Sequence, residues 1–261
     1  MNFNKTGQIL AENQEFIWAG IASTLILSIF GTVVGLFLGI LLAYGKLIKV
    51  KELDNGFVKV LKNILKGFCI VYSTVFRGTP MMVQALIFKY GFKAIGVNFE
   101  NIFFGSMVSN VLNGWLICGL IVITLNTAAY MGEVVISGLN GVDLGQVEGA
   151  RSLGLSSRQT SMSVILPQAL RNALPTIGNE FIVNIKDSSV LNVIAVTELY
   201  YRLKDIAATN YAFLESYLIL AVIYLIMTLL AGLAFKLVEK KLDGKKISLN
   251  PFGRLLRRNE I

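Results

Sequence analysis

The sequence predicts an all-α integral membrane protein with five transmembrane helices. Hydrophobic residues make up 54% of its 261 residues and charged residues only 15%, compared with roughly 45–50% and 25% in soluble domains. The apolar residues form runs long enough to cross a hydrocarbon core of about 30 Å. We therefore expect one membrane domain over residues 1–261, with spans at about 16–45, 67–90, 115–137, 176–196 and 214–236.

The composition also excludes several classes of site. The chain has no histidine, which rules out a Ser-His-Asp triad, a His-rich zinc site and a histidine proton relay within it. Cys69 and Cys118 both lie in apolar segments, where small buried hydrophobes are the ordinary interpretation. The net charge of +8 comes from basic residues beside apolar spans, which favours anionic lipid over nucleic acid as their partner. We predict no catalytic, cofactor-binding or metal-binding residue.

The first two spans each carry one distinctive feature. Gly31, Gly35 and Gly39 recur every fourth residue in the first span, so one helix face permits close packing of another helix. Six lysines between residues 46 and 66 accompany apolar residues at helical spacing, which predicts a cytoplasmic interfacial helix before the second span. Pro80 should break that second span, because proline lacks the backbone donor. Arg77, just before the break, is either a functional residue or a structural ion pair.

The third and fourth spans carry polar side chains at helical spacing. In the third span, Asn126 and Tyr130 share one face, and Glu133 lies one turn further on. In the fourth span, Glu180, Asn184 and Asp187 share a face. Such a stripe faces protein or a water-filled cavity, so it is either part of a translocation path or a satisfied interhelical network. The sequence leaves both interpretations open.

The remaining segments should lie outside the membrane. Phe99, Ile102, Phe103 and Phe104 suggest an external interfacial helix, and residues 198–210 an external loop. Five spans leave six segments outside the membrane, including both termini. Three of these segments hold seventeen Lys or Arg in total, and the other three hold five. The positive-inside rule then places the N-terminus outside, the C-terminus in the cytoplasm and the loop at about 138–172 in the cytoplasm.

That loop contains two helix starts separated by a stop. Asp143 with Gln146, and Ser156 with Gln159, each fit an N-cap with an amide at N3. Gly154 lies where the first short helix should end in a left-handed residue. We expect a helix, a turn and a second helix. The first helix is short enough to need a docking surface, which need not belong to this chain.

The same loop carries a family resemblance. Glu148-Gly149-Ala150, followed by Gly154 and Val164-Ile165-Leu166-Pro167, resembles the "EAA" loop of ABC importer permeases, with Gly149 and Val164 in place of the usual Ala and Ile. Three further motifs are similar to the polar amino-acid branch: FRGTP at 76–80, LPQALR at 166–171 and KDSS at 186–189.

The resemblance implies a fold, a function and partners. The fold would be that of a type I importer permease in a bacterial cell membrane. The chain would be a non-catalytic subunit that forms the translocation path in a dimer, with a second copy or a related permease. A separate ATPase that binds ATP and magnesium and an extracytoplasmic amino-acid-binding protein would complete the importer. The implied ATPase-coupling residues are Glu148, Gly149, Ala150, Arg151, Gly154 and Pro167.

No Walker motif is present in this chain, in keeping with a separate ATPase. Candidate path residues are Arg77, Asn126, Tyr130, Glu180, Asn184 and Asp187, which suit a zwitterionic or a cationic amino acid. A secondary transporter driven by an ion gradient is the alternative, and would use Glu180 and Asp187.

Overall fold

The computed structural model describes residues 3–97, 99, 111 and 114–242, and helices account for nearly all of them. In chain order the elements are α1 (Phe3–Glu12), α2 (Gln14–Leu47), α3 (Gly56–Gly78), α4 (Met81–Ala94), α5 (Gly114–Asn140), α6 (Leu144–Ser152), α7 (Ser157–Thr160), the π-helical turn η2 (Ser161–Ile165), α8 (Leu166–Asp187), the 3-10 helix η3 (Ser188–Ile194), α9 (Leu199–Asn210) and α10 (Phe213–Leu242).

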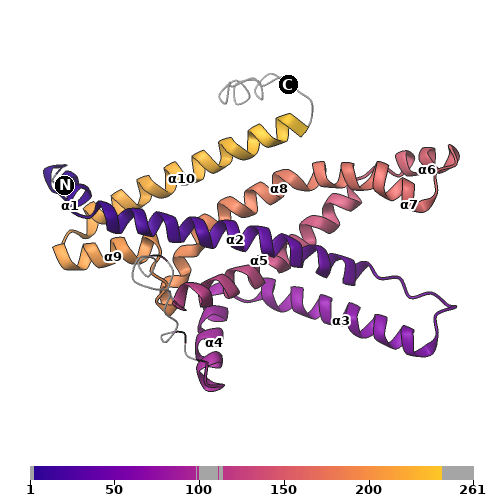
Figure 1. The fold of residues 1–261 in the computed structure, drawn as a ribbon, viewed down its shortest axis with the longest axis horizontal. Coiled ribbons are helices and arrows are strands. Elements are labelled where there is room, and N and C mark those ends of the chain that lie inside the picture. Colours follow the sequence, from indigo (N-terminus) through magenta and orange to yellow (C-terminus); the bar gives the residue numbers. More distant parts are fainter. Residues whose placement is uncertain (1–2, 98, 100–110, 112–113, 243–261) are drawn as a thin grey trace.

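The centre of the bundle is the packing of α2 against α5 (Figure 1). The three predicted packing glycines, Gly31, Gly35 and Gly39, are all buried on the α5 side of α2. A methyl group on Gly39 would lie 2.6 Å from the Cβ of Met131, and one on Gly35 would lie 2.9 Å from Thr127. The two helix backbones therefore approach to a distance that only glycine permits here.

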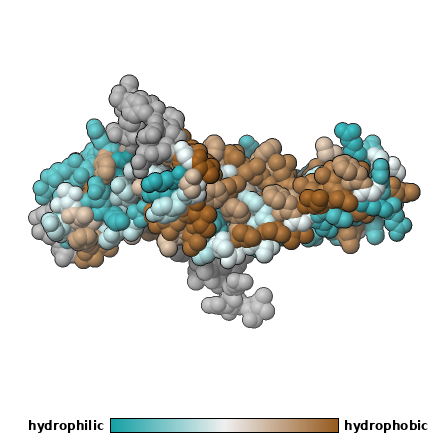
Figure 2. Space-filling view, turned by 90° about the horizontal axis from the view of Figure 1, so that it is seen from below, coloured by the Kyte–Doolittle hydropathy of each residue, from teal (hydrophilic) through white to brown (hydrophobic). Residues whose placement is uncertain are grey.

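Within the part of the chain that the structure describes, three helices are long and apolar enough to cross a membrane: α2, α5 and α10. The helices α3 and α8 are also long, with 23 and 22 residues, but each carries charged side chains along its length. The predicted all-helical class is confirmed, whereas the count of five spans stays a prediction. In Figure 2, hydrophobic residues cover much of the middle of the molecule and hydrophilic residues gather toward its ends.

The segment predicted as an interfacial helix followed by a second span has different boundaries. It is one continuous helix, α3, and the expected boundary near Gly67 is absent. Gly67 lies in open space and no proline interrupts residues 56–78, so nothing ends the helix there. The predicted break at Pro80 is confirmed, because α3 ends at Gly78 and α4 begins at Met81.

Two further elements differ from what the sequence suggested. The helix that carries the fourth span, expected from about residue 176, begins earlier, because α8 starts at Leu166 and continues through Pro175; the bounds of the span itself stay a prediction. The expected external loop at 198–210 is the helix α9, capped by Glu198, whose carboxylate accepts hydrogen bonds from the backbone N–H groups of Tyr200 and Tyr201. Glutamate at this N-cap position was not recognised from the sequence, because the residues usually favoured there are Ser, Thr, Asp and Asn.

The connection before α5 was expected to hold an interfacial helix. Ile102, Phe103 and Phe104 lie outside the described residues. Phe99 is buried, with 5% of its surface exposed, and packs edge-on against Phe92 at 5.2 Å between ring centroids. Phe99 therefore belongs to the protein core and does not lie on a membrane surface.

The ends of the bundle differ in what they contain. The α2–α3 turn and the α6–α7 segment lie at one end, opposite α1 and α9 (Figure 1). The lysines of residues 46–66 and the loop motif from Glu148 to Pro167 thus belong to the same end of the molecule.

Candidate functional site

The break between α3 and α4 is held together by side-chain amides. The Nε2 of Gln84 donates to the carbonyl oxygens of Phe76 and Thr79 at 2.9 and 3.0 Å. Asn126 of α5 donates to Gln84 Oε1 at 3.0 Å and to the Phe76 carbonyl at 3.5 Å. These bonds satisfy carbonyls that the missing N–H of Pro80 and the end of α3 leave open. The break is therefore a fixed polar junction of three helices.

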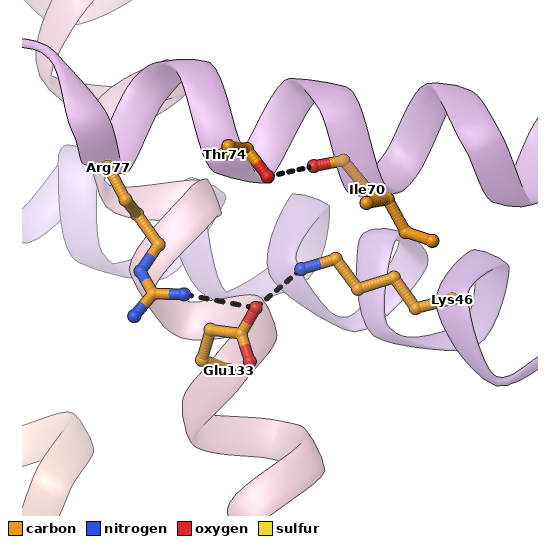
Figure 3. A network of polar contacts seen from close by, with 5 residues as sticks. All are labelled: Lys46, Ile70, Thr74, Arg77 and Glu133. Atoms are coloured by element: carbon orange, nitrogen blue, oxygen red, sulfur yellow. Dashed lines mark hydrogen bonds and ion pairs between the residues drawn. The ribbon is translucent and has the colours of Figure 1, made fainter.

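A three-helix ion cluster lies beside this junction. Glu133 Oε1 on α5 accepts a hydrogen bond from Lys46 Nζ of α2 at 2.5 Å, and Arg77 Nη1 of α3 lies 3.2 Å from the same oxygen (Figure 3). The Arg77 guanidinium carbon is 5.7 Å from the centroid of the Tyr130 ring. Lys46 is 12% exposed, whereas Arg77 is 43% exposed. The structural ion pair considered for Arg77 is thus present, and a large part of the guanidinium stays accessible.

The polar stripe on α8 separates into two kinds of residue. Asn184 is buried; its Oδ1 accepts from Thr127 of α5 at 3.0 Å, and its Nδ2 donates to Thr32 of α2 at 2.9 Å. Asn184 thus belongs to an interhelical network. Glu180 and Asp187 are partly buried, and within the described residues neither carboxylate takes part in a hydrogen bond or salt bridge. They are the stripe's two carboxylates available to a ligand.

The loop predicted to couple to another subunit has the expected helix, turn and helix. Gly154 adopts a φ of +83°, the left-handed conformation that ends α6. Ser156 forms the predicted capping box, since Ser156 Oγ accepts from Gln159 N and Gln159 Oε1 accepts from Ser156 N. At Asp143 the cap bond goes to the backbone N–H of Gly145 at 2.8 Å. Asp143 and Gln146, both within the described residues, form no capping box, because the Gln146 backbone N–H donates to the Asp143 carbonyl and not to its side chain.

The short helix α6 projects from the bundle, and its main contacts within the described residues are with its own neighbours α7 and η2 (Figure 1). Glu148, Gly149 and Arg151 are exposed, whereas Ala150 is buried against the rest of the loop. Leu144 and Leu153, at the two ends of α6, are 74% and 82% exposed.

Pro167 explains an irregularity that the sequence analysis missed. Between α7 and α8 the chain forms the π-helical turn η2, in which the backbone N–H of Leu166 donates to the Ser161 carbonyl. Pro167 has no N–H to donate and its ring crowds the carbonyl four residues earlier, and here the chain widens into the π-helical turn. Pro167 itself is exposed. Its position inside a helical segment was the available signal.

A second buried cluster, also missed, lies at the opposite end. Glu198 is fully buried and accepts hydrogen bonds from Tyr224 at 2.9 Å and Thr24 at 3.5 Å, in addition to its two backbone donors. Burial raises the pKa of the Glu198 carboxyl, and these donors oppose the shift. The cluster ties α9 to α2 and α10. Assigning residues 198–210 to a loop concealed it.

Two further residues contact predicted site residues but were not themselves predicted as part of the site. Lys46 was counted among the six lysines of the expected interfacial helix, and Gln84 carried no signal except its place four residues after Pro80. The placement of Glu133 one turn beyond Tyr130 agrees with the structure, where both face Arg77.

Comparison with known proteins decides the family. The profile of the family described as "Binding-protein-dependent transport system inner membrane component" matches residues 35–244. The chain belongs to this family. Several of the relatives that it matches are described as amino-acid transport permeases.

Two relatives and two structures show how far this family membership extends. The chain is 30% identical over 230 residues to the arginine transport system permease protein ArtQ of Bacillus subtilis, covering 88% of this chain and 93% of that one. It is 31% identical to the putative glutamine transport system permease protein GlnP of Rickettsia conorii, covering 87% and 93%. A crystal structure of an amino acid ABC transporter with histidines matches with a TM-score of 0.74 at 30% identity, covering 89% and 96%.

An inward-facing MetNI methionine ABC transporter matches with a TM-score of 0.57 at 18% identity, covering 87% of this chain and 94% of that chain. This second match shows the shared permease fold alone.

Proposed function

We propose that the chain is the membrane subunit of an ATP-driven amino-acid importer, and that it is moved by a separate ATPase through residues 143–167. The projecting α6 carries this proposal. It exposes Glu148 and Arg151 between two exposed leucines, and it is joined through Gly154 and the capped Ser156 to the rigid α8. A short helix held by a moving partner can act as a lever on the helices to either side.

Within this lever we assign separate roles to the predicted residues. Glu148 and Arg151 offer charges to complementary groups on the ATPase. Gly149 permits close approach there, because a side chain at this position would meet nothing of this chain. Buried Ala150 anchors α6 to the loop, Gly154 sets the turn, and Pro167 fixes the junction with α8. ATP and magnesium are bound by the ATPase, and this chain is non-catalytic.

The translocation path is proposed to lie between two permease subunits. Arg77, Asn126 and Tyr130 surround the polar break between α3 and α4, and Glu180, Asn184 and Asp187 lie on α8. In a dimer the charged members of this set, Arg77, Glu180 and Asp187, would face a shared axis. Unpaired carboxylates at Glu180 and Asp187 would attract the ammonium group of a zwitterionic or cationic amino acid.

The proposed orientation follows the charges. The α2–α3 turn, with its lysines, and the α6–α7 loop would face the cytoplasm of a bacterial cell, and the N-terminus would be outside. An extracytoplasmic binding protein would deliver the amino acid at the end that holds α9. Basic residues beside the spans would contact anionic lipid.

Uptake into proteoliposomes tests the proposal against the ion-gradient alternative. The chain is reconstituted with and without the ATPase and binding protein, and radiolabelled amino acids are added outside. We expect uptake only with all components and ATP, independent of a proton or sodium gradient. Uptake by the isolated chain that collapses when an ionophore is added would instead establish a secondary transporter.

A further inference from the structure

A long apolar groove separates the last helix from the rest of the bundle. It has a volume of about 600 Å³ and lies between α2, α8 and α10, where α10 diverges from α2 (Figure 1). Ile17, Ile21 and Leu25 of α2, Phe181 of α8, and Ile226 and Leu230 of α10 are among its walls. Gln14 is the one polar residue that lines it. Since α2 and α10 are apolar enough to span a membrane, this groove lies at the depth of hydrocarbon.

A polar hollow adjoins the groove at its N-terminal end. It has a volume of about 510 Å³, and Gln14 lines both spaces. Glu12 at the end of α1, Glu15 in the first turn of α2 and Arg202 of α9 bring charge to the hollow. Both glutamates are exposed, and within the described residues only Glu12 receives a hydrogen bond, from Gln8 at 2.8 Å. The combined space is thus apolar along its length and charged at one end.

We propose that this space is a binding site for a phospholipid with a primary-amine headgroup, such as phosphatidylethanolamine. One acyl chain lies in the groove and the ammonium group binds the carboxylates of Glu12 and Glu15. Charge complementarity selects this headgroup: a zwitterion places its ammonium near the two glutamates and its phosphate toward Arg202. An anionic headgroup without an amine would face the two carboxylates unpaired.

The position of the site in the leaflet supports a lipid as the occupant. Trp18 lines the groove one turn beyond Gln14 and is 67% exposed. Tryptophan is enriched at the boundary between headgroups and hydrocarbon, which is where the groove passes into the polar hollow. The ligand's ammonium and acyl parts would therefore meet the protein at their usual depths.

Trp18 also makes the proposal measurable. The chain has two tryptophans, so the full-length Trp115→Phe variant reports from the groove, and the Trp18→Phe variant reports from Trp115 as a control. Each is placed in vesicles of equal phosphatidylethanolamine and phosphatidylglycerol, with bromine, a fluorescence quencher, on the acyl chains of one lipid or the other. Overall composition is then identical and only the lipid carrying the quencher changes.

We expect bromine on phosphatidylethanolamine to quench Trp18 more strongly than bromine on phosphatidylglycerol. The difference should correspond to a preference of about fivefold for the amine lipid at the groove, which is the upper range for an exposed ion pair. Trp115 should show no preference. The double substitution Glu12→Gln, Glu15→Gln should bring the preference at Trp18 to about one, while Glu52→Gln in the α2–α3 turn should leave it unchanged. Equal quenching of Trp18 by both lipids, or a preference for phosphatidylglycerol, would overturn the proposal.

Filling the groove tests where the acyl chain lies. Ala231 lines the groove, whereas Ala234, one turn further along α10, is exposed and does not. Ala231→Phe should weaken quenching by the amine lipid, and Ala234→Phe should not. A second copy of the chain is the competing occupant. Efficient disulfide cross-linking between copies through Ile226→Cys, with Cys69 and Cys118 replaced by Ala, would show that a protein fills the groove and would contradict lipid binding.

Discussion

Glu133 of α5 accepts a hydrogen bond from Lys46 of α2 at 2.5 Å, although 87 residues separate them in the chain. The same carboxylate oxygen is 3.2 Å from Arg77 of α3. One acidic side chain thus joins three helices beside the α3–α4 break.

The two ion pairs of Glu133 should differ in strength. Lys46 is only 12% exposed and Arg77 is 43% exposed, so solvent screens the arginine pair more. Double-mutant cycles with Glu133→Gln, Lys46→Met and Arg77→Met, measured as free energies of unfolding in mixed micelles, should give about 1.5–3 kcal/mol for Lys46. The Arg77 pair should contribute below about 1 kcal/mol. A larger coupling for Arg77 would contradict this order.

Asn184 should stabilise the bundle through its two interhelical bonds. Asn184→Leu removes the partners of both Thr32 and Thr127, and each such bond contributes between about 0.6 and 2 kcal/mol in a membrane helix bundle. The free energy of unfolding should therefore fall by about 1–4 kcal/mol. Adding Thr32→Val and Thr127→Val should recover part of the loss, because the buried hydroxyls are then gone. If the three substitutions together lower the free energy of unfolding by the sum of their separate effects, no such network exists.

Gly39 should tolerate no side chain. Gly39→Ala places a methyl group 2.6 Å from Met131 Cβ, and overpacking of this kind costs about 1–3 kcal/mol. The matched control is Gly67→Ala in α3, where nothing lies within 4 Å and a gain of up to about 1 kcal/mol is expected from helix propensity. Thermal unfolding in detergent measures both. Equal melting temperatures for the two variants would contradict the close packing of α2 on α5.

Glu198 should be essential for docking α9. Glu198→Gln replaces one of two acceptor oxygens with a donor that faces backbone N–H or hydroxyl groups, at a cost of about 1–3 kcal/mol. Asp205→Asn, an exposed change on the same helix, should leave the melting temperature unchanged. If both variants have the melting temperature of the wild type, the Glu198 cluster does not hold α9.

The features that could be predicted are those whose causes lie within a few residues of one another in the sequence. Capping at Ser156, the left-handed turn at Gly154 and the break at Pro80 arise within a few residues, so the sequence predicted them. The close approach at Gly31, Gly35 and Gly39 follows a helical spacing that is equally local.

Other features depend on residues far apart in the chain. The partners of Arg77 and Asn184 lie on other helices, and no spacing within one segment indicates them. The loop assigned at 198–210 is a helix because its N-cap glutamate is buried against α2 and α10. The π-helical turn before Pro167 is local, and was missed because the proline was considered only as part of a motif.

The central claim is that α6 couples this chain to an ATPase, and the most direct test is ATP hydrolysis in the reconstituted complex. Glu148→Ala removes the exposed charge, and Gly154→Ala forces a side chain into a φ of +83° at a cost of about 1–2 kcal/mol. Gly67→Ala in α3, outside the coupling loop and where a methyl group meets nothing of this chain, is the control. We predict that hydrolysis stimulated by the binding protein is lost in the first two variants and kept in the control, with all three folded. Unchanged stimulation in both Glu148→Ala and Gly154→Ala would contradict the account.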